Sequence, residues 1–210
     1  MSRIAILGVS GYTGLELCKL LLRHPDVNIT ALGTRQEGGP HVAEVHPSLA
    51  NRLDLCLEQL TTEELVERAD CVFSFLPHGA SAKAVAPLVD AGLKVVDFSA
   101  DYRLIDVAVY EQWYGVKHPD PARLKTAAYG LPEFYREAIA AATLVANPGC
   151  YPTAAVLGLA PLLRRGLIAA EGIIVDSKSG VSGAGRNPKA NLHFPECNES
   201  FAAYGVGEHR

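Results

Sequence analysis

Cysteine pairs, long charge runs and long apolar runs are all scarce in this sequence of 210 residues. The five cysteines include no C-x-x-C pair and no closely spaced series. This spacing argues against a disulfide framework, a zinc site or another metal centre, and it fits a reducing compartment. The apolar run after Met1-Ser2-Arg3 is too short for a signal peptide, so we expect a cytoplasmic protein.

An excess of positive charge is also missing. The 19 Lys and Arg residues stand against 23 Asp and Glu, which gives a formal net charge of −4, and the charges are dispersed. A chain of this kind is not expected to bind nucleic acid or an anionic membrane. Residues 138–163 carry no charge, but Asn147-Pro148-Gly149 and Pro152 interrupt them, so they do not form a membrane-spanning helix.

Apolar residues make up 49% of the chain, which is typical of a globular protein with a substantial core. Short apolar runs alternate with helix-period patterns over the first 100 residues. Because strands that alternate with helices form parallel sheets, this pattern predicts a Rossmann-type, doubly wound α/β fold. The expected strands are 4–7, 27–32, 71–76 and 93–98, and the expected helices are 15–22, one that begins at Thr61, and 80–91.

The remaining segments are less regular. We expect a loop at 34–50, a loosely helical region at 104–114, a strand at 144–146, a helix from about 152 to 165 and a strand at 173–176. A composition shift near residue 148 predicts a nucleotide-binding domain at 1–147. Residues 148–210 would then begin an α+β substrate domain.

Three glycines, Gly8, Gly11 and Gly14, lie between the first strand and the first helix. The first permits a sharp turn, the second lets backbone approach a pyrophosphate, and the third lets the helix pack on the strand. Backbone N–H groups at the helix start would face the phosphates. The G-x-x-G-x-x-G spacing differs from the usual G-x-G-x-x-G, so a glycine turn without a ligand is the alternative.

The second expected strand ends in Thr34-Arg35-Gln36, where NAD sites usually carry an acidic residue. A guanidinium and a hydroxyl suit a 2′-phosphate, so the sequence favours NADP. A solvated surface arginine is the alternative. Leu76-Pro77-His78-Gly79 is expected to line the cofactor cleft, with His78 either catalytic or a helix-capping or packing residue.

Cys150 follows one expected strand and precedes a helix, where the helix dipole favours a thiolate. The alternative is a small buried side chain in a turn. Cys18, on the apolar face of a helix, and Cys71, at the start of a buried strand, are expected to be packing residues. A thiolate beside a nicotinamide suggests attack on an activated acyl group and release of an aldehyde by hydride transfer. Such a site also needs an acid/base and cationic groups, and the candidates are His193, His209, Arg103 and Arg186.

Segments 8–14, 97–103, 129–133, 147–153, 179–186 and 204–210 together resemble the N-acetyl-γ-glutamyl-phosphate reductase family. The chain is similar, more distantly, to aspartate-semialdehyde dehydrogenases. The first resemblance implies NADPH-dependent reduction of N-acetyl-γ-glutamyl phosphate to N-acetylglutamate 5-semialdehyde and phosphate, a step of arginine biosynthesis. It also implies a homo-oligomer, either a tetramer or a dimer. The family continues beyond the position of Arg210, which implies that this chain is either a partial, C-terminally truncated sequence or an incomplete enzyme.

The same resemblance implies roles for individual residues. Cys150 would be the nucleophile and His209 would lie in the catalytic histidine region. The residues implied to hold NADP(H) are Gly8, Ser10, Gly11, Tyr12, Thr13, Gly14, Thr34, Arg35, Gln36, Ser179, Gly180, Ser182 and Gly183, and those implied to bind substrate are Arg103, Asn147 and Arg186. The alternatives are aspartyl-phosphate reduction, a non-catalytic NADP-binding regulator and, last, a cysteine hydrolase.

Overall fold

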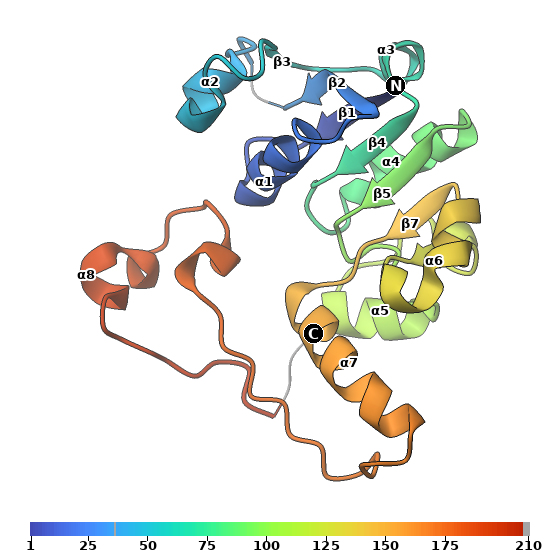
Figure 1. Ribbon diagram of the computed structural model, residues 1–210, viewed down its shortest axis with the longest axis vertical. Helices are drawn as coiled ribbons and strands as arrows, with labels where there is room; N and C mark the ends of the chain where they lie inside the picture. Colours follow the sequence, from blue (N-terminus) through green and yellow to red (C-terminus); the bar gives the residue numbers. More distant parts are fainter. Residues whose placement is uncertain (36, 208–210) are drawn as a thin grey trace. The chain divides into compact units, whose positions relative to one another are not determined.

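The computed structural model describes residues 1–35 and 37–207 (Figure 1). The chain divides into two compact units, Met1–Val175 and Asp176–Arg210. The domain boundary expected at 147/148 remains a prediction. No helix among the described residues is both long and apolar enough to cross a membrane.

The first unit contains one seven-stranded sheet in the order β3-β2-β1-β4-β5-β7-β6. Every strand pair in it is parallel, which confirms the predicted doubly wound α/β fold. The strands are β1 (Ser2–Leu7), β2 (Val27–Gly33), β3 (Leu57–Glu58), β4 (Cys71–Ser74), β5 (Lys94–Asp97), β6 (Ala128–Tyr129) and β7 (Leu144–Ala146).

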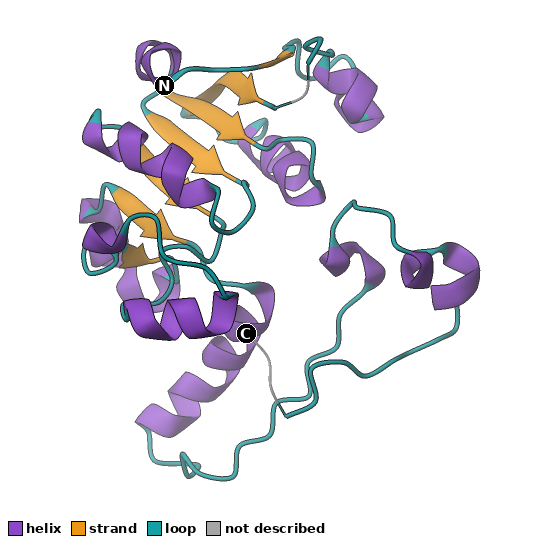
Figure 2. Cartoon of the chain, turned by 180° about the vertical axis from the view of Figure 1, so that it is seen from behind, coloured by secondary structure: helices purple, strands orange, loops and turns teal. Residues whose placement is uncertain are grey.

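Helices connect these strands and lie on both faces of the sheet (Figure 2). In the first unit they are α1 (Tyr12–Leu21), α2 (Val42–Val45), α3 (Thr62–Arg68), α4 (Ser81–Asp90), α5 (Val107–Tyr114), α6 (Pro132–Ala141) and α7 (Cys150–Arg164), with short 3-10 helices η1 (Pro47–Leu49) and η2 (Pro121–Arg123). The second unit contains η3 (Val181–Ala184), η4 (Ala190–Leu192) and α8 (Phe194–Cys197).

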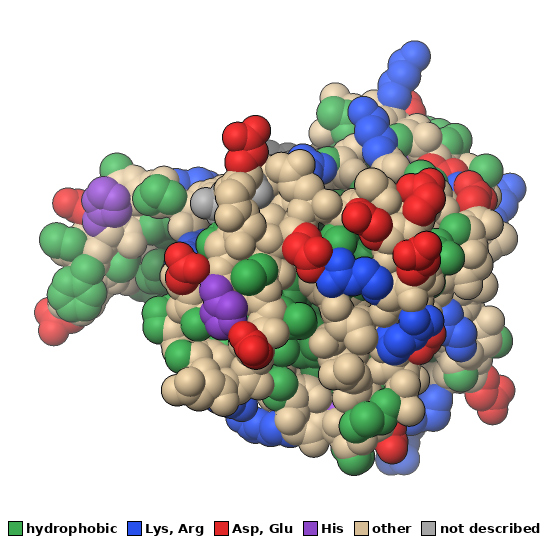
Figure 3. All heavy atoms as spheres, turned by 90° about the horizontal axis from the view of Figure 1, so that it is seen from above, with side chains coloured by type: hydrophobic (Ala, Val, Ile, Leu, Met, Phe, Trp, Pro, Cys, Tyr) green, Lys and Arg blue, Asp and Glu red, His purple; other side chains and the backbone are tan. Residues whose placement is uncertain are grey.

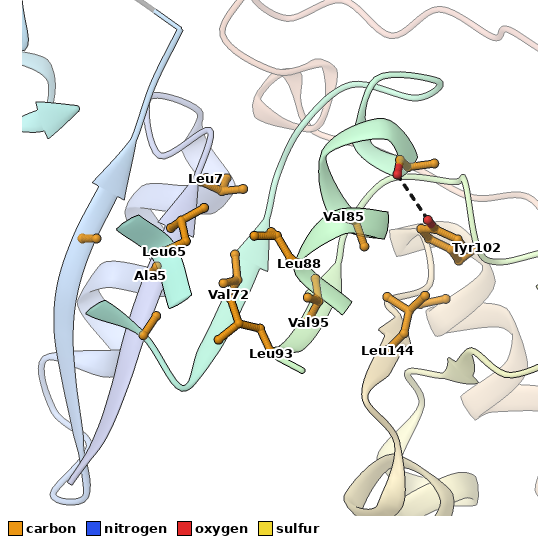
Figure 4. Close-up of a cluster of buried hydrophobic side chains, with 14 of the residues drawn as sticks. Ala5, Leu7, Leu65, Val72, Val85, Leu88, Leu93, Val95, Tyr102 and Leu144 are labelled. Carbon is orange, nitrogen blue, oxygen red and sulfur yellow. Dashed lines mark hydrogen bonds between the residues drawn. The ribbon is translucent and has the colours of Figure 1, made fainter. Parts of the chain in front are cut away.

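The sheet separates two hydrophobic cores, because successive side chains of a strand point to opposite faces. In β1, Ala5 and Leu7 join a cluster that contains residues of α3 and α4 (Figure 4). Ile4 and Ile6 join a second cluster with Cys18 of α1. Because both faces of β1 are covered, the residues from Ile4 to Leu7 form one continuous buried run, as is typical of a central parallel strand.

Local sequence determines where several helices begin. Thr61 caps α3 through a capping box with Glu64, as the hydroxyl followed by acidic residues predicts. Asp106 caps α5 by accepting hydrogen bonds from two backbone N–H groups. That helix ends at Gly115, whose φ of 67° is the left-handed conformation that glycine adopts without strain.

The expected loop at 34–50 is wrong in part, because it contains α2 and η1. His41 caps α2, and Val42 and Leu49 are fully buried against the second cluster. The sequence reading also omitted α6. Its proline at the first helical position and its amphipathic pattern were both available signals.

The strand expected at 173–176 is also wrong. Ile174 is 92% exposed and Val175 is 54% exposed. A strand exists only where its backbone bonds to a neighbour, and among the described residues none pairs with this segment. An apolar run by itself therefore did not define a strand here.

Hydrogen bonds connect the carboxyl ends of the strands in sheet order. Gly8 N–H donates to Gly33, Phe75 N–H to Leu7, and Phe98 N–H to Ser74. Further along the sheet, the Asn147 N–H donates to the Asp97 carbonyl. The loops that follow β1, β2, β4, β5 and β7 therefore all begin at one edge of the sheet, where ligands bind in open α/β sheets.

Candidate active site

The glycine turn leads from β1 into α1 at this carboxyl edge. Gly8 has a φ of 76°, and a Cβ on it would lie 3.0 Å from the Phe75 carbonyl oxygen. A Cβ on Gly14 would lie 2.8 Å from both Cα and O of Val9. These distances confirm the sharp turn expected at the first glycine and the close helix–strand packing expected at the third.

Gly11 has a different environment from the other two glycines. It is the N-cap of α1 and makes no side-chain cap hydrogen bond, and a Cβ added there would meet only the Gly8 oxygen, 3.9 Å away. The first N–H groups of a helix have no partner inside the helix, so they suit an anionic ligand. Tyr12 and Thr13, the first helical residues, are exposed. The turn thus has the backbone that a dinucleotide pyrophosphate requires.

The turn also lies at the point where the strand order of the sheet reverses. Starting at β1, the chain builds β2 and β3 on one side and β4 and β5 on the other. The crevice between the carboxyl ends of β1 and β4 is therefore a topological switch point, the usual ligand position in this architecture. Loop 75–79 borders it, in contact distance of Gly8 through the Phe75 carbonyl.

His78 connects the loop after β4 to the loop after β5. It is exposed, and its Nδ1 accepts a hydrogen bond from the Ala100 N–H at 2.8 Å. The ring also lies edge-on to Tyr114, with centroids 5.4 Å apart. These contacts hold the loop after β4 against the loop after β5, which is a packing role.

The end of β2 presents the residues expected to recognise a 2′-phosphate. The Thr34 N–H donates to the Glu58 carbonyl, and Arg35 is exposed. The Glu58 carboxylate accepts two hydrogen bonds from Arg68, at 2.7 and 2.8 Å, which lowers its pKa. The carboxylate of Glu58, the residue hydrogen-bonded to Thr34, is thus paired with Arg68. Gln36 lies outside the described residues.

Cys150 is the first residue of α7. Its N-cap, Gly149, makes no side-chain cap hydrogen bond, and the cysteine is exposed. The N-terminal end of the helix, where the helix dipole is positive, therefore lies at an accessible sulfur. Its exposure argues against the alternative of a small buried side chain.

The other cysteines have different environments. Cys18 is fully buried, and burial raises the pKa of its thiol to about 11. Burial also raises the pKa of Cys71, in β4, to about 11. Both are packing residues, as expected. Cys56 is exposed, and Cys197 is half-buried in the second unit.

Arg103 lies beneath the loop that carries Cys150. Its Nε donates to the Asn147 carbonyl and its Nη2 to the Phe98 carbonyl, each at 2.7 Å. Its Nη1 is 3.4 Å from the point where a Cβ on Gly149 would stand. The guanidinium therefore joins the loop after β5 to the loop after β7, and only part of its donor set remains for a ligand.

Two buried carboxylates support these loops. Asp97, at the end of β5, is fully buried and accepts hydrogen bonds from the hydroxyls of Ser81 and Ser99, both at 2.5 Å. Desolvation raises the pKa of its carboxyl. Asp101 accepts from the N–H groups of Gly79 and Ala82, and so caps α4 from the neighbouring loop.

The second unit contains the serine–glycine loop. Ser179, Gly180, Ser182, Gly183 and Arg186 are all exposed in it, and η3 forms its middle. A Cβ on Gly183 would meet the Ser179 hydroxyl, so the loop folds tightly on itself. His193 is the N-cap of α8, and His209 lies outside the described residues. The structure thus brings together the turn, Arg103, Asn147 and Cys150 at one sheet edge, whereas the roles expected in 176–210 stay predictions.

The sequence reading missed one residue at this site. His46, which follows α2, is 4% exposed, and its Nε2 lies 2.9 Å from the Val9 carbonyl oxygen in the glycine turn. A histidine in a segment expected to be a polar loop gave no signal of burial. The apolar residues at 42, 45 and 49 could have indicated that this segment packs on the sheet.

Charge does not concentrate on the face seen in Figure 3, where acidic and basic side chains are interspersed with uncharged ones. Among the described residues several charged groups form ion pairs, for example Arg3 with Asp70 and Arg123 with Asp120. That face therefore has no extended surface of a single sign.

Family models match most of the chain. Residues 3–142 match the model described as semialdehyde dehydrogenase, NAD binding domain, and residues 150–210 match semialdehyde dehydrogenase, dimerisation domain. Among solved structures, aspartate semialdehyde dehydrogenase with NADP from Candida albicans covers 79% of this chain and 47% of its own, with 21% identity and a TM-score of 0.61. Aspartate semialdehyde dehydrogenase II from Vibrio cholerae gives 18% identity and a TM-score of 0.55. These structures share the fold.

Curated relatives are much more similar in sequence. N-acetyl-gamma-glutamyl-phosphate reductase from Rhodopirellula baltica is 51% identical over 208 residues, which are 99% of this chain and 60% of the relative. The protein of the same name from Desulfotalea psychrophila is 54% identical over 211 residues, covering 100% of this chain and 61% of the relative. The chain thus spans about 60% of the length of these relatives.

Proposed function

The chain belongs to the semialdehyde dehydrogenase family, and we propose that it is the nucleotide-binding and nucleophile-bearing part of an NADPH-dependent acyl-phosphate reductase. The proposed substrate is N-acetyl-γ-glutamyl phosphate, and the products are N-acetylglutamate 5-semialdehyde and phosphate. The substrate rests on the names of the curated relatives at 51% and 54% identity.

One observation carries the proposal: the glycine turn and Cys150 lie at the same edge of one sheet. The turn follows β1 and the cysteine follows β7, three strands away in the order β1-β4-β5-β7. At the usual strand spacing this is roughly 14 Å across the sheet. A dinucleotide anchored by its pyrophosphate at the turn can therefore extend along the edge toward the sulfur.

The residues at the turn fit NADP(H). Gly8, Gly11 and Gly14 would admit the pyrophosphate, and the backbone from Ser10 to Thr13 would bind it. Thr34 and Arg35 would bind the 2′-phosphate, and Gln36 is assigned there with them. Ser179, Gly180, Ser182 and Gly183 are proposed to contact the nicotinamide end. When bound, NADPH supplies the hydride.

Cys150 is the proposed nucleophile. Its thiolate attacks the acyl carbon, the C–O bond to phosphate breaks, and inorganic phosphate leaves with the electron pair of that bond. The acyl group is then a thioester on Cys150. Hydride addition to its carbonyl carbon breaks the C–S bond, so the semialdehyde departs and the thiolate is restored.

Charged and polar residues around the sulfur are proposed to hold the substrate. Arg103 and Asn147 border the Cys150 loop in the first unit, and Arg186 is assigned to the same role. His209 is the proposed acid/base, with His193 as the second candidate. Because two nitrogens of Arg103 already donate to backbone, we assign its Nη1 to the anion.

The reverse reaction tests the proposal. In the complete enzyme, semialdehyde, phosphate and NADP⁺ should yield NADPH, which is followed by its absorbance. Cys150→Ser should abolish the signal, because a hydroxyl is far less ionised than a thiol. Cys56→Ser changes another exposed cysteine and serves as the matched control. Near-normal turnover by the Cys150 variant would refute the mechanism. Faster turnover of aspartate semialdehyde than of N-acetylglutamate 5-semialdehyde would mean that the substrate is aspartyl phosphate instead.

A non-catalytic NADP-binding regulator is the second candidate. It is favoured because the glycine turn alone provides the backbone for nucleotide binding and does not need Cys150. It requires that Cys150 be no more reactive than Cys56. Comparison of the alkylation rates of these two exposed thiols, by peptide mapping, separates the two functions. Faster alkylation of Cys150 supports the reductase, and equal rates support the regulator.

The wider setting of the reaction follows from the same proposal. We assign the enzyme to the cytoplasm and to arginine biosynthesis. We also infer a homo-oligomer, a dimer or tetramer, because residues 150–210 match a dimerisation-domain model. Light scattering on the purified protein measures the oligomeric mass, and a monomer would contradict the assignment.

A further inference from the structure

We propose that His46 is a positioning residue for the nucleotide turn, and that its hydrogen bond to the Val9 carbonyl orients the backbone that binds the cofactor pyrophosphate. This inference rests on the proposed NADPH binding. His46 belongs neither to the glycine motif nor to the three residues assigned to the 2′-phosphate, so the inference adds a new residue to the proposed cofactor site. The role is indirect, because His46 acts through the peptide between Val9 and Ser10.

The location of His46 is unusual for a titratable side chain. It lies between α2 and η1, and only 4% of the residue is exposed. Val42 and Leu49, on either side of it, are fully buried in the same cluster as Val9 and Cys18. A polar ring in such surroundings needs a hydrogen-bond partner. The Val9 carbonyl oxygen, 2.9 Å from Nε2, is that partner.

The partner is a backbone group of the turn itself. A carbonyl oxygen only accepts, so the hydrogen of this bond lies on Nε2 of His46. The neutral ring with its hydrogen on Nε2 and the doubly protonated ring both meet this requirement. The contact is therefore a brace in which the His46 ring is the donor and the backbone of the turn is the acceptor.

The Val9 carbonyl is also confined on another side. The position of a Cβ on Gly14 is only 2.8 Å from the same oxygen, so α1 approaches it closely. The peptide bonds of the described chain are trans and planar, so the Ser10 N–H points opposite to the Val9 carbonyl. Fixing the carbonyl between His46 and Gly14 thus fixes the direction of the Ser10 N–H, which belongs to the proposed pyrophosphate site.

Substitutions at position 46 can separate the hydrogen bond from simple packing. His46→Met fills a similar space without a donor. His46→Gln places an amide nitrogen at about the reach of Nε2 and retains the donor. His24→Met makes the same chemical change at an exposed histidine beyond the end of α1 and is the matched control.

The experiment measures binding of NADPH to the whole chain by calorimetry, and binding of adenosine 2′-monophosphate by competition. For His46→Met we expect the Kd of NADPH to rise about tenfold, the size of one lost buried hydrogen bond. Adenosine 2′-monophosphate lacks the pyrophosphate, so its Kd should stay within about twofold of the wild-type value. His46→Gln and His24→Met should leave both constants near those of the wild type.

Other results would overturn the inference. An unchanged Kd for NADPH in His46→Met would mean that the brace does not serve the turn, and an equal loss for both ligands would mean a general loss of structure. Failure of His46→Gln to retain binding would mean that the donor is irrelevant. If the Met variant does not fold, His46→Asn replaces it, because its shorter amide cannot reach Val9. A wild-type chain that binds no NADPH would instead refute the proposed function.

Discussion

At the scale of single residues, the three glycines of the turn perform three different physical tasks. Gly8 adopts a φ of 76°, Gly14 leaves room for the Val9 backbone, and Gly11 leaves the backbone open on its outer side. The structure confirms the turn predicted at Gly8 and the close packing predicted at Gly14, whereas the approach of a pyrophosphate to Gly11 stays a prediction. The sequence could not predict the brace from His46, which depends on how a distant segment packs.

Alanine at Gly14 should lower the stability of the fold, whereas alanine at Gly11 should weaken the binding of NADPH. At Gly14 the added Cβ would lie 2.8 Å from backbone atoms of Val9, so α1 must shift, and we expect a loss of about 1–3 kcal/mol in the free energy of unfolding. Gly11 has a φ of −77° and open space, so Gly11→Ala should retain stability. If pyrophosphate approaches Gly11, this variant should nevertheless bind NADPH at least about tenfold more weakly.

Urea denaturation and NADPH titration of the two variants check this pair. A stable Gly11→Ala protein with wild-type affinity for NADPH would contradict the proposed place of the pyrophosphate. A Gly14→Ala protein as stable as the wild type would contradict the close packing of α1.

Asp97 should make stability depend on pH. Burial raises the pKa of its carboxyl above the ordinary value of 3.8, so the folded chain holds this proton more tightly than the unfolded chain does. The contribution is therefore fully present below pH 3.8 and decreases as the pH rises through the folded-state pKa. In Asp97→Asn this dependence is absent, so the stability advantage of the wild type should shrink between pH 4 and pH 7.

Urea denaturation of both proteins across that range measures the difference. Asp26→Asn, at an exposed position, is the control for a general effect of carboxylate removal. A wild-type advantage that is constant with pH would rule out a raised pKa at Asp97.

At the scale of secondary-structure elements, the strands followed from sequence more closely than the segments between them. The core of β1, all of β2 except Gly33, and the whole of β7 were predicted because their short apolar runs end at glycine or at an Asn-Pro-Gly turn. The strand expected at 173–176 failed because pairing needs a partner, which a run of apolar residues does not reveal. The segment with α2 failed for the opposite reason, since its few buried residues are separated by polar ones.

The loop after β7 is the element that presents the nucleophile, and Arg103 should control it. Arg103→Met removes two side-chain donors from the Asn147 and Phe98 carbonyls, so we expect about 1–3 kcal/mol less stability. The loop should also become looser, which changes the alkylation rate of Cys150 and leaves that of Cys56 unaltered. Arg103→Lys should not rescue, because a single ammonium does not reproduce the planar fork.

Arg136→Met removes the same charge from the exposed face of α6 and is the control. Peptide mapping after timed alkylation gives the rate for each cysteine. Unchanged stability together with an unchanged Cys150 rate in Arg103→Met would show that the arginine does not support this loop, and would leave it a ligand-binding role alone.

At the scale of the whole molecule, the parallel sheet brings motifs that are far apart in the sequence to one edge. The motifs lie in five loops that span residues 8 to 150, and parallel pairing alone brings their starts together. This could be predicted from sequence, because alternating strands and helices determine the side on which every loop emerges. The contacts of Arg103, Asp97 and His46 could not, since each depends on side-chain packing between loops.

Acyl transfer to Cys150 is the measurement that tests the proposed function most directly. The purified protein is incubated with N-acetyl-γ-glutamyl phosphate in the absence of NADPH, and the intact mass and the modified peptide are determined. We predict a gain of one N-acetylglutamyl group on Cys150, release of one phosphate per group, and no adduct in Cys150→Ala. An unmodified wild-type protein, or an adduct that persists in Cys150→Ala, would contradict the proposed nucleophile.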